Sequence, residues 1–472
     1  MTVRALALAA VLLTAGGCAV GPDYRSPAPN APAQTGFVGT ASPAVTAAPP
    51  PGQWWRLYRD PALDGLVAQA LQANTDLRIA AANLAQARAA LREVRSGLLP
   101  STTVSASASR GRASAAAQGV GTRFADSSSF DVGLDASYQI DLFGRLRRGI
   151  EAARADAEGV QAAYDLARIT VAADTTRAYA DACAFGQQLE VANRSRDLQQ
   201  QSYDLTRALL ERGRGTGLDV ARTAALLEQT RAEIPALEAQ RKGALYRLAV
   251  LTGRPPAEVS PAADACKAPP VLDSTIPVGD GAMLLARRPD VRRSERALAA
   301  ATARIGVATA DLYPSVSLGG SIGSTAASIS GLGRSNAPRF SIGPLIQWSF
   351  PNILAAQARI AQARAANEAA LAEFDGTWLR ALQETETALA AYAGDLDRRQ
   401  ALSDARDQSA RASQLAHARF QAGYVSFIDV LDADRTLAAA EATLVQQEAQ
   451  VSADQIALFL ALGGGWEPQS AG

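Results

Sequence analysis

Apolar residues recur with a period of seven along residues 74–98. Leucines stand seven apart, and small apolar residues fill the positions between them: Leu77, Leu84, Leu91 and Leu98, with Ala80, Ala87 and Val94. This a/d heptad pattern predicts a helix that supercoils left-handedly against a partner helix. Because alanine occupies much of this seam, we expect the two helix backbones to approach closely.

Two longer helices are predicted by proline-free helical patterns over residues 145–211 and 354–421. About 67 residues at ~1.5 Å each give roughly 100 Å of helix, far longer than a globular domain. Each long helix ends at a glycine-containing loop, from which a helix of about 35 residues returns: RGRGTGLD (212–219) leads into 218–252, and QAGYVSFID (421–429) leads into 427–461. We expect two short helices to lie end to end beside each long one.

Apolar and polar residues alternate over 130–142 and over 340–350. Leu134 and Ile346 belong to the apolar set, and Ser341 belongs to the polar set. Alternation over more than ten residues is typical of membrane barrel strands, whose apolar side chains face lipid and whose polar side chains face a lumen. A strand of a soluble sandwich is the alternative, but such strands average only ~5–6 residues.

The same succession of elements occurs twice in the chain. Asp76 aligns with Asp290 at an offset of 214, and after a hairpin that is four residues longer in the first copy the offset becomes 210, which aligns Gly213 with Gly423. A repeat of about 210 residues is too long for a solenoid unit and indicates a duplicated half-subunit. We divide the chain as follows: signal peptide 1–17, extended N-terminal segment 18–52, first repeat 53–253, inter-repeat linker 254–280, second repeat 281–463 and tail 464–472.

The N-terminus has the pattern of a secretory signal. Arg4 precedes the apolar run 5–13, and small residues then lead to Cys18. A cysteine directly after the cleavage site predicts a bacterial lipoprotein with Cys18 lipidated, although Ala15 stands where leucine is usual. An ordinary signal peptide with a free Cys18 is the alternative. Ala19 after the cysteine favours transport to the outer membrane.

Composition excludes several classes of function. The 46 basic and 46 acidic residues are interspersed, so no basic surface for nucleic acid is expected. The single histidine, His417, argues against most histidine metal sites and histidine-based catalysis, and we expect it at a solvated helix position. We therefore predict no enzyme activity, cofactor or metal. Cys183 and Cys266 do not form a disulfide scaffold, but one bridge between them stays open.

The predicted strands require more than one chain. Two strands in each repeat give four per chain, and four membrane strands cannot close a barrel, whose open edges in lipid would cost several kcal/mol per unpaired group. Two chains would supply eight strands with an interior filled by side chains, and three would supply twelve with room for water. The polar lumen residues favour a homotrimer. The predicted fold class is α+β, a membrane β-barrel continued by a long helical coiled coil.

At this point the chain resembles the TolC-like outer membrane efflux factors, in particular their OprM/NodT-type lipoprotein branch. The resemblance covers essentially the whole mature chain and rests on the order, spacing and duplication of short motifs. These are CAVGPDYRSPAP from Cys18, Trp55 with DPALDGLV (60–67), Asn74 with its heptads, LLP and DLYP before the strands, QIDLFGR (139–145), the two tip loops and ALGGGW (461–466).

The resemblance implies a passive, trimeric outer membrane channel. A twelve-stranded barrel continues into a tunnel of twelve helices across the periplasm, with an equatorial region midway. The closed end of the tunnel docks a periplasmic adaptor protein and, through it, an inner-membrane resistance-nodulation-division transporter. The adaptor-facing tip residues carried over are Arg212, Gly213, Thr216, Asp219, Gly423 and Ser426.

The same resemblance places the periplasmic aperture just after the second tip loop. Ile428 would be an apolar constriction, and Asp429 and Asp432, three apart on one helical face, would form acidic rings. Some family members carry an arginine lock in this loop, but Val425 stands there in this chain. Arg222 is the duplicate of Asp432, which suggests an Asp432–Arg222 latch between adjacent helices. For Asp429 the alternative is a residue favoured at a helix N-terminus by the helix dipole.

Two other functions remain open on the sequence. The chain could serve as the outer membrane component of type I protein secretion, or as a structural periplasmic coiled-coil lipoprotein without a channel. The second leaves the four alternating strands without a purpose. Neither the transported substrate nor the identity of the pump and adaptor follows from the residues.

Overall fold

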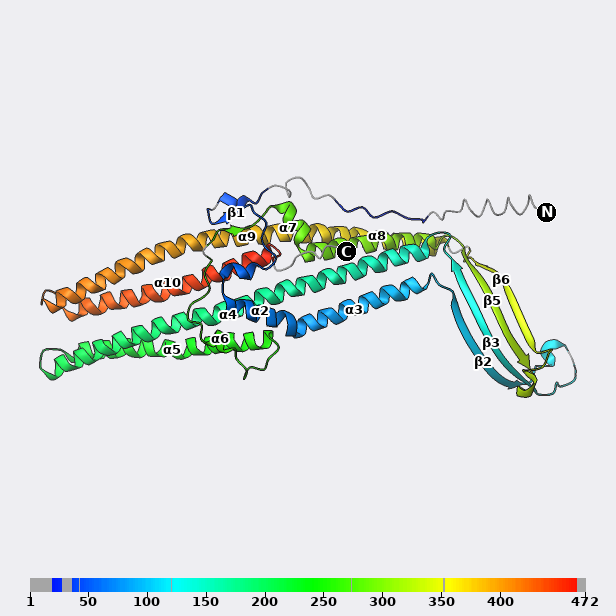
Figure 1. Cartoon of the computed structure of the whole chain (residues 1–472), viewed down its shortest axis with the longest axis horizontal. Coiled ribbons are helices and arrows are strands. Elements are labelled where there is room, and N and C mark those ends of the chain that lie inside the picture. The colour runs from blue at the N-terminus through cyan, green and yellow to red at the C-terminus, as the bar shows by residue number, and fades with distance from the viewer. Residues whose placement is uncertain are drawn as a thin grey trace. The chain divides into compact units, whose positions relative to one another are not determined.

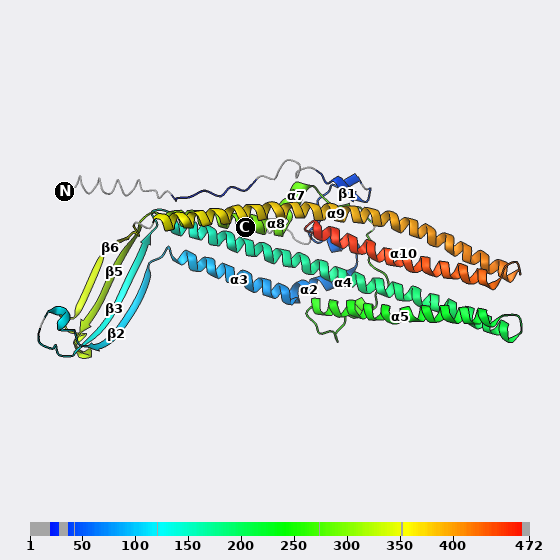
Figure 2. The ribbon, with the colours of Figure 1, turned by 180° about the vertical axis from the view of Figure 1, so that it is seen from behind.

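The computed structural model describes residues 19–27, 36–41, 43–119, 121–272, 274–350 and 353–464. Long helices dominate these residues, and Figures 1 and 2 both show α5 running back beside α4 and α10 running back beside α9. The main helices are α2 (Pro61–Ala73), α3 (Thr75–Ser96), α4 (Arg145–Glu211), α5 (Gly217–Leu251), α8 (Pro289–Ala310), α9 (Ile353–Gln421) and α10 (Phe427–Ala461). Within the described ranges, no helix combines the length and apolarity needed to cross a bilayer.

The helix bounds reproduce the duplication seen in the sequence. Helices α3 and α8 have 22 residues each and are offset by 214 (289 minus 75), and α5 and α10 have 35 residues each and are offset by 210 (427 minus 217). The long helices α4 and α9 have 67 and 69 residues. The predicted long helices and their shorter return helices are thus confirmed.

The four long strands form one antiparallel sheet in the order β2-β3-β5-β6. Their bounds are β2 (Ser101–Gly111), β3 (Ser127–Ile140), β5 (Ser315–Ala326) and β6 (Pro338–Gln347). The strands of the two repeats meet at β3 and β5, where Leu134 is opposite Ile322 and Asp131 is opposite Thr325. Strands β2 and β6 are the edges, and each pairs with only one neighbour among the described strands.

Shorter elements connect the long helices and strands. The parallel pair β1–β4 joins Val45 to Ile276 and Thr46 to Pro277, so the N-terminal segment pairs with the inter-repeat linker. Glu386 of α9 accepts hydrogen bonds from the backbone N–H groups of Val38 and Gly39, at 2.7 and 3.0 Å. The short elements are η2 (Val38–Ala41), β1 (Val45–Thr46), η3 (Trp54–Tyr58), η4 (Ala116–Gln118), α6 (Pro261–Asp264), β4 (Ile276–Pro277), α7 (Gly281–Arg287) and η5 (Ile329–Gly331).

The chain divides into two compact units, and each draws on both repeats. The first comprises residues 1–27, 84–160 and 293–374 and holds the sheet. The second comprises 28–83, 161–292 and 375–472 and holds the main apolar core, in which Trp54 stacks on Phe459 with ring centroids 4.7 Å apart. The repeats are therefore units of sequence and not separate folding units.

Candidate channel wall and helix tips

One face of the four-stranded sheet is polar and carries an ion pair. Arg339 of β6 reaches across β5 to Asp131 of β3, with an Nη2–Oδ1 distance of 2.9 Å. The Thr325 hydroxyl of β5 donates to the same carboxylate at 2.6 Å, and the hydroxyls of Ser321 and Ser341 lie 2.8 Å apart. This face has the water-seeking groups expected of a lumen wall.

Two glycines leave room for the arginine to cross the sheet. A Cβ on Gly323 would lie 2.7 Å from the Val132 carbonyl oxygen and 3.3 Å from the Arg339 guanidinium carbon, and a Cβ on Gly133 would lie 3.2 Å from an Arg339 nitrogen. A side chain at Gly323 would therefore have to displace backbone. The sequence did not predict the ion pair between Asp131 of β3 and Arg339 of β6. These two strands are not neighbours in the sheet, because β5 lies between them.

The opposite set of positions is apolar and uncovered in a single chain. Phe340 and Ile342 are 83% and 77% exposed, and Leu134, Ile322 and Ile346 are exposed as well. A row of large exposed apolar side chains on one sheet marks a surface that needs an apolar environment. The alternation predicted from the sequence is confirmed as a two-faced sheet.

Both long hairpins turn through the same local structure. Gly213 and Gly423 have φ of +69° and +77°, and each donates its backbone N–H to the residue three positions earlier, at 2.9 Å. The return helices then begin with matching capping boxes. Asp219 accepts from the Thr216 hydroxyl at 2.6 Å, and Asp429 accepts from the Ser426 hydroxyl at 2.7 Å.

This capping role changes the interpretation of Asp429. Hydrogen bonds from the Ser426 hydroxyl and backbone N–H to the Asp429 carboxylate hold the pKa of that carboxyl below its usual value. The structure thus shows the helix N-terminal role that was the alternative for Asp429. Asp432, one turn further into α10, has no part in the capping box.

The remaining aperture residues lie on the first turns of the return helices. Ile428 is half exposed, and no ion pair joins Asp432 to Arg222 within the described part of one chain. The hypothesised latch is therefore not an intrachain contact in this structure. His417 is exposed on α9, as expected, and its ring also lies 3.0 Å from the Asp434 carboxylate.

The segment that follows the predicted lipidation site is docked on helices. Cys18 lies outside the described residues. The backbone N–H of Val20 donates to the Phe143 carbonyl at 3.2 Å, Asp23 pairs with Arg148 at 2.6 Å, and the Tyr24 hydroxyl donates to Glu295 at 2.5 Å. The proline content predicted an extended segment but could not predict these contacts.

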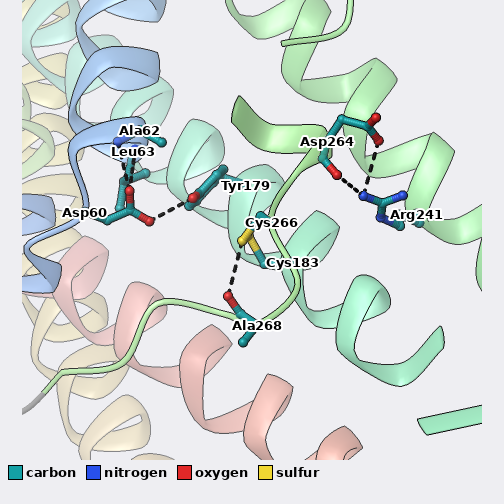
Figure 3. The surroundings of a disulfide bond; sticks show 9 residues. All are labelled: Asp60, Ala62, Leu63, Tyr179, Cys183, Arg241, Asp264, Cys266 and Ala268. Carbon is teal, nitrogen blue, oxygen red and sulfur yellow. Dashed lines mark hydrogen bonds and ion pairs between the residues drawn. A yellow bond between two sulfur atoms is a disulfide. The ribbon is translucent and has the colours of Figure 1, made fainter. Parts of the chain in front are cut away.

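A disulfide joins Cys183 of α4 to Cys266 of the linker (Figure 3). Beside it, Arg241 of α5 pairs with Asp264 at 3.2 Å. These two contacts fasten the linker to the first repeat. The sequence left the pairing open, and the structure shows it.

Several motif residues act as helix caps. Asp60 accepts from the backbone N–H groups of Ala62 and Leu63, at 2.8 and 3.2 Å, and from the Tyr179 hydroxyl at 2.8 Å (Figure 3). Asn74 caps α3 and also donates to the Leu251 carbonyl at 3.1 Å. These motif residues therefore stabilise the fold.

Among the described residues, no group of three or more His, Cys, Asp or Glu side chains is placed to hold a metal ion.

Comparisons with known proteins agree with this architecture. A family model described as outer membrane efflux protein matches residues 66–254 and 282–464, a stretch in each repeat. Nodulation protein T of Rhizobium leguminosarum biovar viciae is 30% identical over 471 residues, which cover 98% of this chain and 93% of that protein. Outer membrane protein OprJ of Pseudomonas aeruginosa is 31% identical and covers 97% of this chain and 95% of its own.

The structure of the outer-membrane channel OprN matches this chain with a TM-score of 0.89 at 36% identity, covering 96% of this chain and 100% of OprN. OprN is an outer-membrane channel. The two-faced sheet, the duplicated helical hairpins and the full-length similarity lead to one conclusion: the chain belongs to the outer membrane efflux protein family and is an outer membrane efflux channel.

Proposed function

We propose that three copies of this chain close one barrel and one helical tunnel, through which substrates pass passively from a periplasmic adaptor and an inner-membrane resistance-nodulation-division transporter. The open sheet carries this proposal. Among the described residues of a single chain, the outer edges of β2 and β6 pair with no other strand, and unpaired backbone groups are too costly to leave in lipid. Three sheets of four strands supply twelve, enough for a water-filled lumen.

Cysteine crosslinking between the sheet edges tests this assembly. One cysteine replaces Thr103 on β2, and the second is moved along β6 at Ser341, Gly343 and Leu345. In the trimer, β2 of one chain pairs with β6 of the next, so oxidation yields a covalent trimer on a denaturing gel. The control is Thr103→Cys with Asp135→Cys, which face each other within one chain and give a crosslinked monomer. Monomer alone from every edge pair would contradict the proposal.

The tips of the hairpins are the surface proposed for the adaptor. Leu218 and Tyr424 are exposed apolar side chains beside the two tip turns, and exposed apolar groups near polar loops are typical of protein contacts. The proposed surface also includes Arg212, Gly213, Thr216, Asp219, Gly423 and Ser426. We expect Leu218→Ser and Tyr424→Ser to lose binding to purified adaptor in a pull-down. Both variants should still form the trimer.

We further propose Ile428 and Asp432 as the closing ring, with Asp432 pairing to Arg222 of a neighbouring chain. The capping bonds of Asp429 leave Asp432 as the acid that is available for this role. Three Asp432 carboxylates around a narrow opening would attract cations. Asp432→Ala should increase single-channel conductance in planar bilayers and lower the preference for cations, whereas unchanged conductance and selectivity would place the gate elsewhere.

A further inference from the structure

The only histidine of the chain faces a groove near the tip of the second hairpin. The groove has a volume of about 230 Å³ and lies among α4, α9 and α10. Its polar lining consists mainly of Gln199 and Ser202 from α4, Ser413 and His417 from α9, and Asp434 and Glu441 from α10.

Two of these side chains converge on the carboxylate of a third, Asp434. The His417 Nε2 atom lies 3.0 Å from both Asp434 oxygens, and the Ser413 hydroxyl donates to Oδ1 of Asp434 at 2.6 Å. Ser413 and His417 are four residues apart on one face of α9, so both approach Asp434 from the same helix. The Asp434 side chain is 13% exposed and that of His417 is 48% exposed. Asp434 therefore relies on α9 for the hydrogen bonds that water would otherwise supply.

The surroundings leave few groups that could compete with this contact. The ionisable side chains lining the groove are His417, Asp434 and Glu441, and the lining residues of α4 are uncharged. Gln199 is only 3% exposed, and its Oε1 has no hydrogen-bond partner among the described residues. Among the residues that line the groove, His417 is the side chain that becomes a better hydrogen-bond donor on protonation.

We propose that His417 and Asp434 form a proton-dependent clasp that positions the start of α10 against α9 and makes the closing of the channel depend on pH. This inference rests on the aperture proposed above, because Asp434 follows Asp432 by two residues on α10. Histidine gains its charge between about pH 5 and 8. A hydrogen bond from imidazolium to carboxylate is roughly twice as strong as one between neutral groups. Acid therefore tightens the clasp and favours the closed channel, and alkaline conditions loosen it.

A double-mutant cycle at two pH values tests the clasp. The four proteins are the wild type, His417→Gln, Asp434→Asn and the double variant, reconstituted as full-length trimers in planar bilayers at pH 5.5 and 7.5. The wild type should open about threefold more often at pH 7.5 than at pH 5.5. Both single variants and the double variant should lose this difference and open equally often. Glu441→Gln, which lines the same groove, should keep the pH dependence of the wild type.

The outcomes separate the clasp from the aperture. The clasp would be overturned if the open probability of His417→Gln had the same pH dependence as that of the wild type. It would also be overturned if the effects of the two single variants on open probability simply multiplied in the double variant. If His417→Gln abolishes the pH dependence while Asp432→Ala leaves conductance unchanged, the clasp stands and the aperture is misplaced. Trimer bands on unboiled gels confirm that each variant has assembled, and Asp434→Asn keeps an oxygen to accept the Ser413 hydroxyl.

Discussion

Cys183 and Cys266 are bonded to each other with their Cα atoms 4.9 Å apart, although 83 positions separate them in the sequence. The bond closes a long segment that contains α5 and the first part of the linker. In the chain-entropy model, closing a loop of this length stabilises the folded state by about 4 kcal/mol. Bonds of this kind persist in the oxidising periplasm, where an outer membrane channel folds.

The double variant Cys183→Ser/Cys266→Ser should therefore unfold at a lower temperature than the wild type, by about 4 °C. Circular dichroism at the helix band measures this on the purified trimer. The wild type treated with a reductant should approach the variant. If the variant and the oxidised wild type melt together, the disulfide does not stabilise the fold.

Arginine substitutions on the two faces of the sheet should have unequal effects. Ile346→Arg puts charge on the apolar face, at a cost of about 2–4 kcal/mol near the middle of the bilayer, and three copies of it are present in each trimer. Its trimer band should disappear from unboiled gels of outer membranes. Ser341→Arg, on the polar face of the same strand, is the matched control and should assemble. Equal tolerance of both changes would mean that the faces are assigned the wrong way round.

A carboxyl pair between α9 and α10 should make stability depend on pH. Burial, followed by the hydrogen bond with Asp395, raises the pKa of Asp454 to about 6, while the hydrogen bond from Asp454 holds the pKa of Asp395 below its usual value. Gln450 and Gln447 donate to the two carboxyls at 2.9 and 2.7 Å. One proton shared between the two carboxyls explains why the pKa of Asp454 is raised while that of Asp395 is lowered.

Because its pKa is raised on folding, Asp454 adds stability that is complete below about pH 4 and is lost as pH rises through about 6. Asp454→Asn should melt with the wild type at pH 4.5 and about 3 °C above it at pH 7.5. Asp404→Asn, at an exposed position of α9, should not alter the pH dependence. A variant that keeps the wild-type loss of stability between these pH values would rule out the shared proton.

Removal of the predicted lipidation site should separate anchoring from channel formation. Cys18→Ser should abolish labelling with a radioactive fatty acid, because serine lacks the sulfur that would carry the lipid group. Trimer formation should persist, since the sheet supplies its own apolar face and the segment after Cys18 is held by the Asp23–Arg148 and Tyr24–Glu295 contacts. Undiminished acyl labelling in the variant would contradict the lipoprotein assignment.

The fold was largely predictable because its elements are long and periodic. Heptads and proline-free stretches indicated the helices to within a few residues, and alternation indicated the two faces of β3 and β6. Contacts between segments distant in the sequence were not predictable in the same way. Nothing in the spacing of Cys183 and Cys266 shows that they meet, and nothing on α9 alone shows that His417 faces Asp434.

The candidate site was predicted less completely than the fold. The acid at Asp429 fitted both a ring of charges and a helix cap, since both favour a carboxylate at that position, and only the hydrogen bonds of Ser426 show the capping role. The Asp432–Arg222 latch depended on a spatial relation between helices that sequence spacing does not contain. Its test requires the assembled trimer.

The mixing of both repeats within each compact unit bears on how such a chain could have originated. A half-length ancestor with two strands would have needed six identical copies to supply the twelve strands proposed for the barrel. Fusion of two copies halves the number of molecules that must meet, and it allows the halves to diverge. At the repeat offset of 210, Ala393 stands opposite Cys183, and Arg207 stands opposite His417. The disulfide and the histidine contact therefore each exist in one half alone, which a ring of six identical molecules could not achieve.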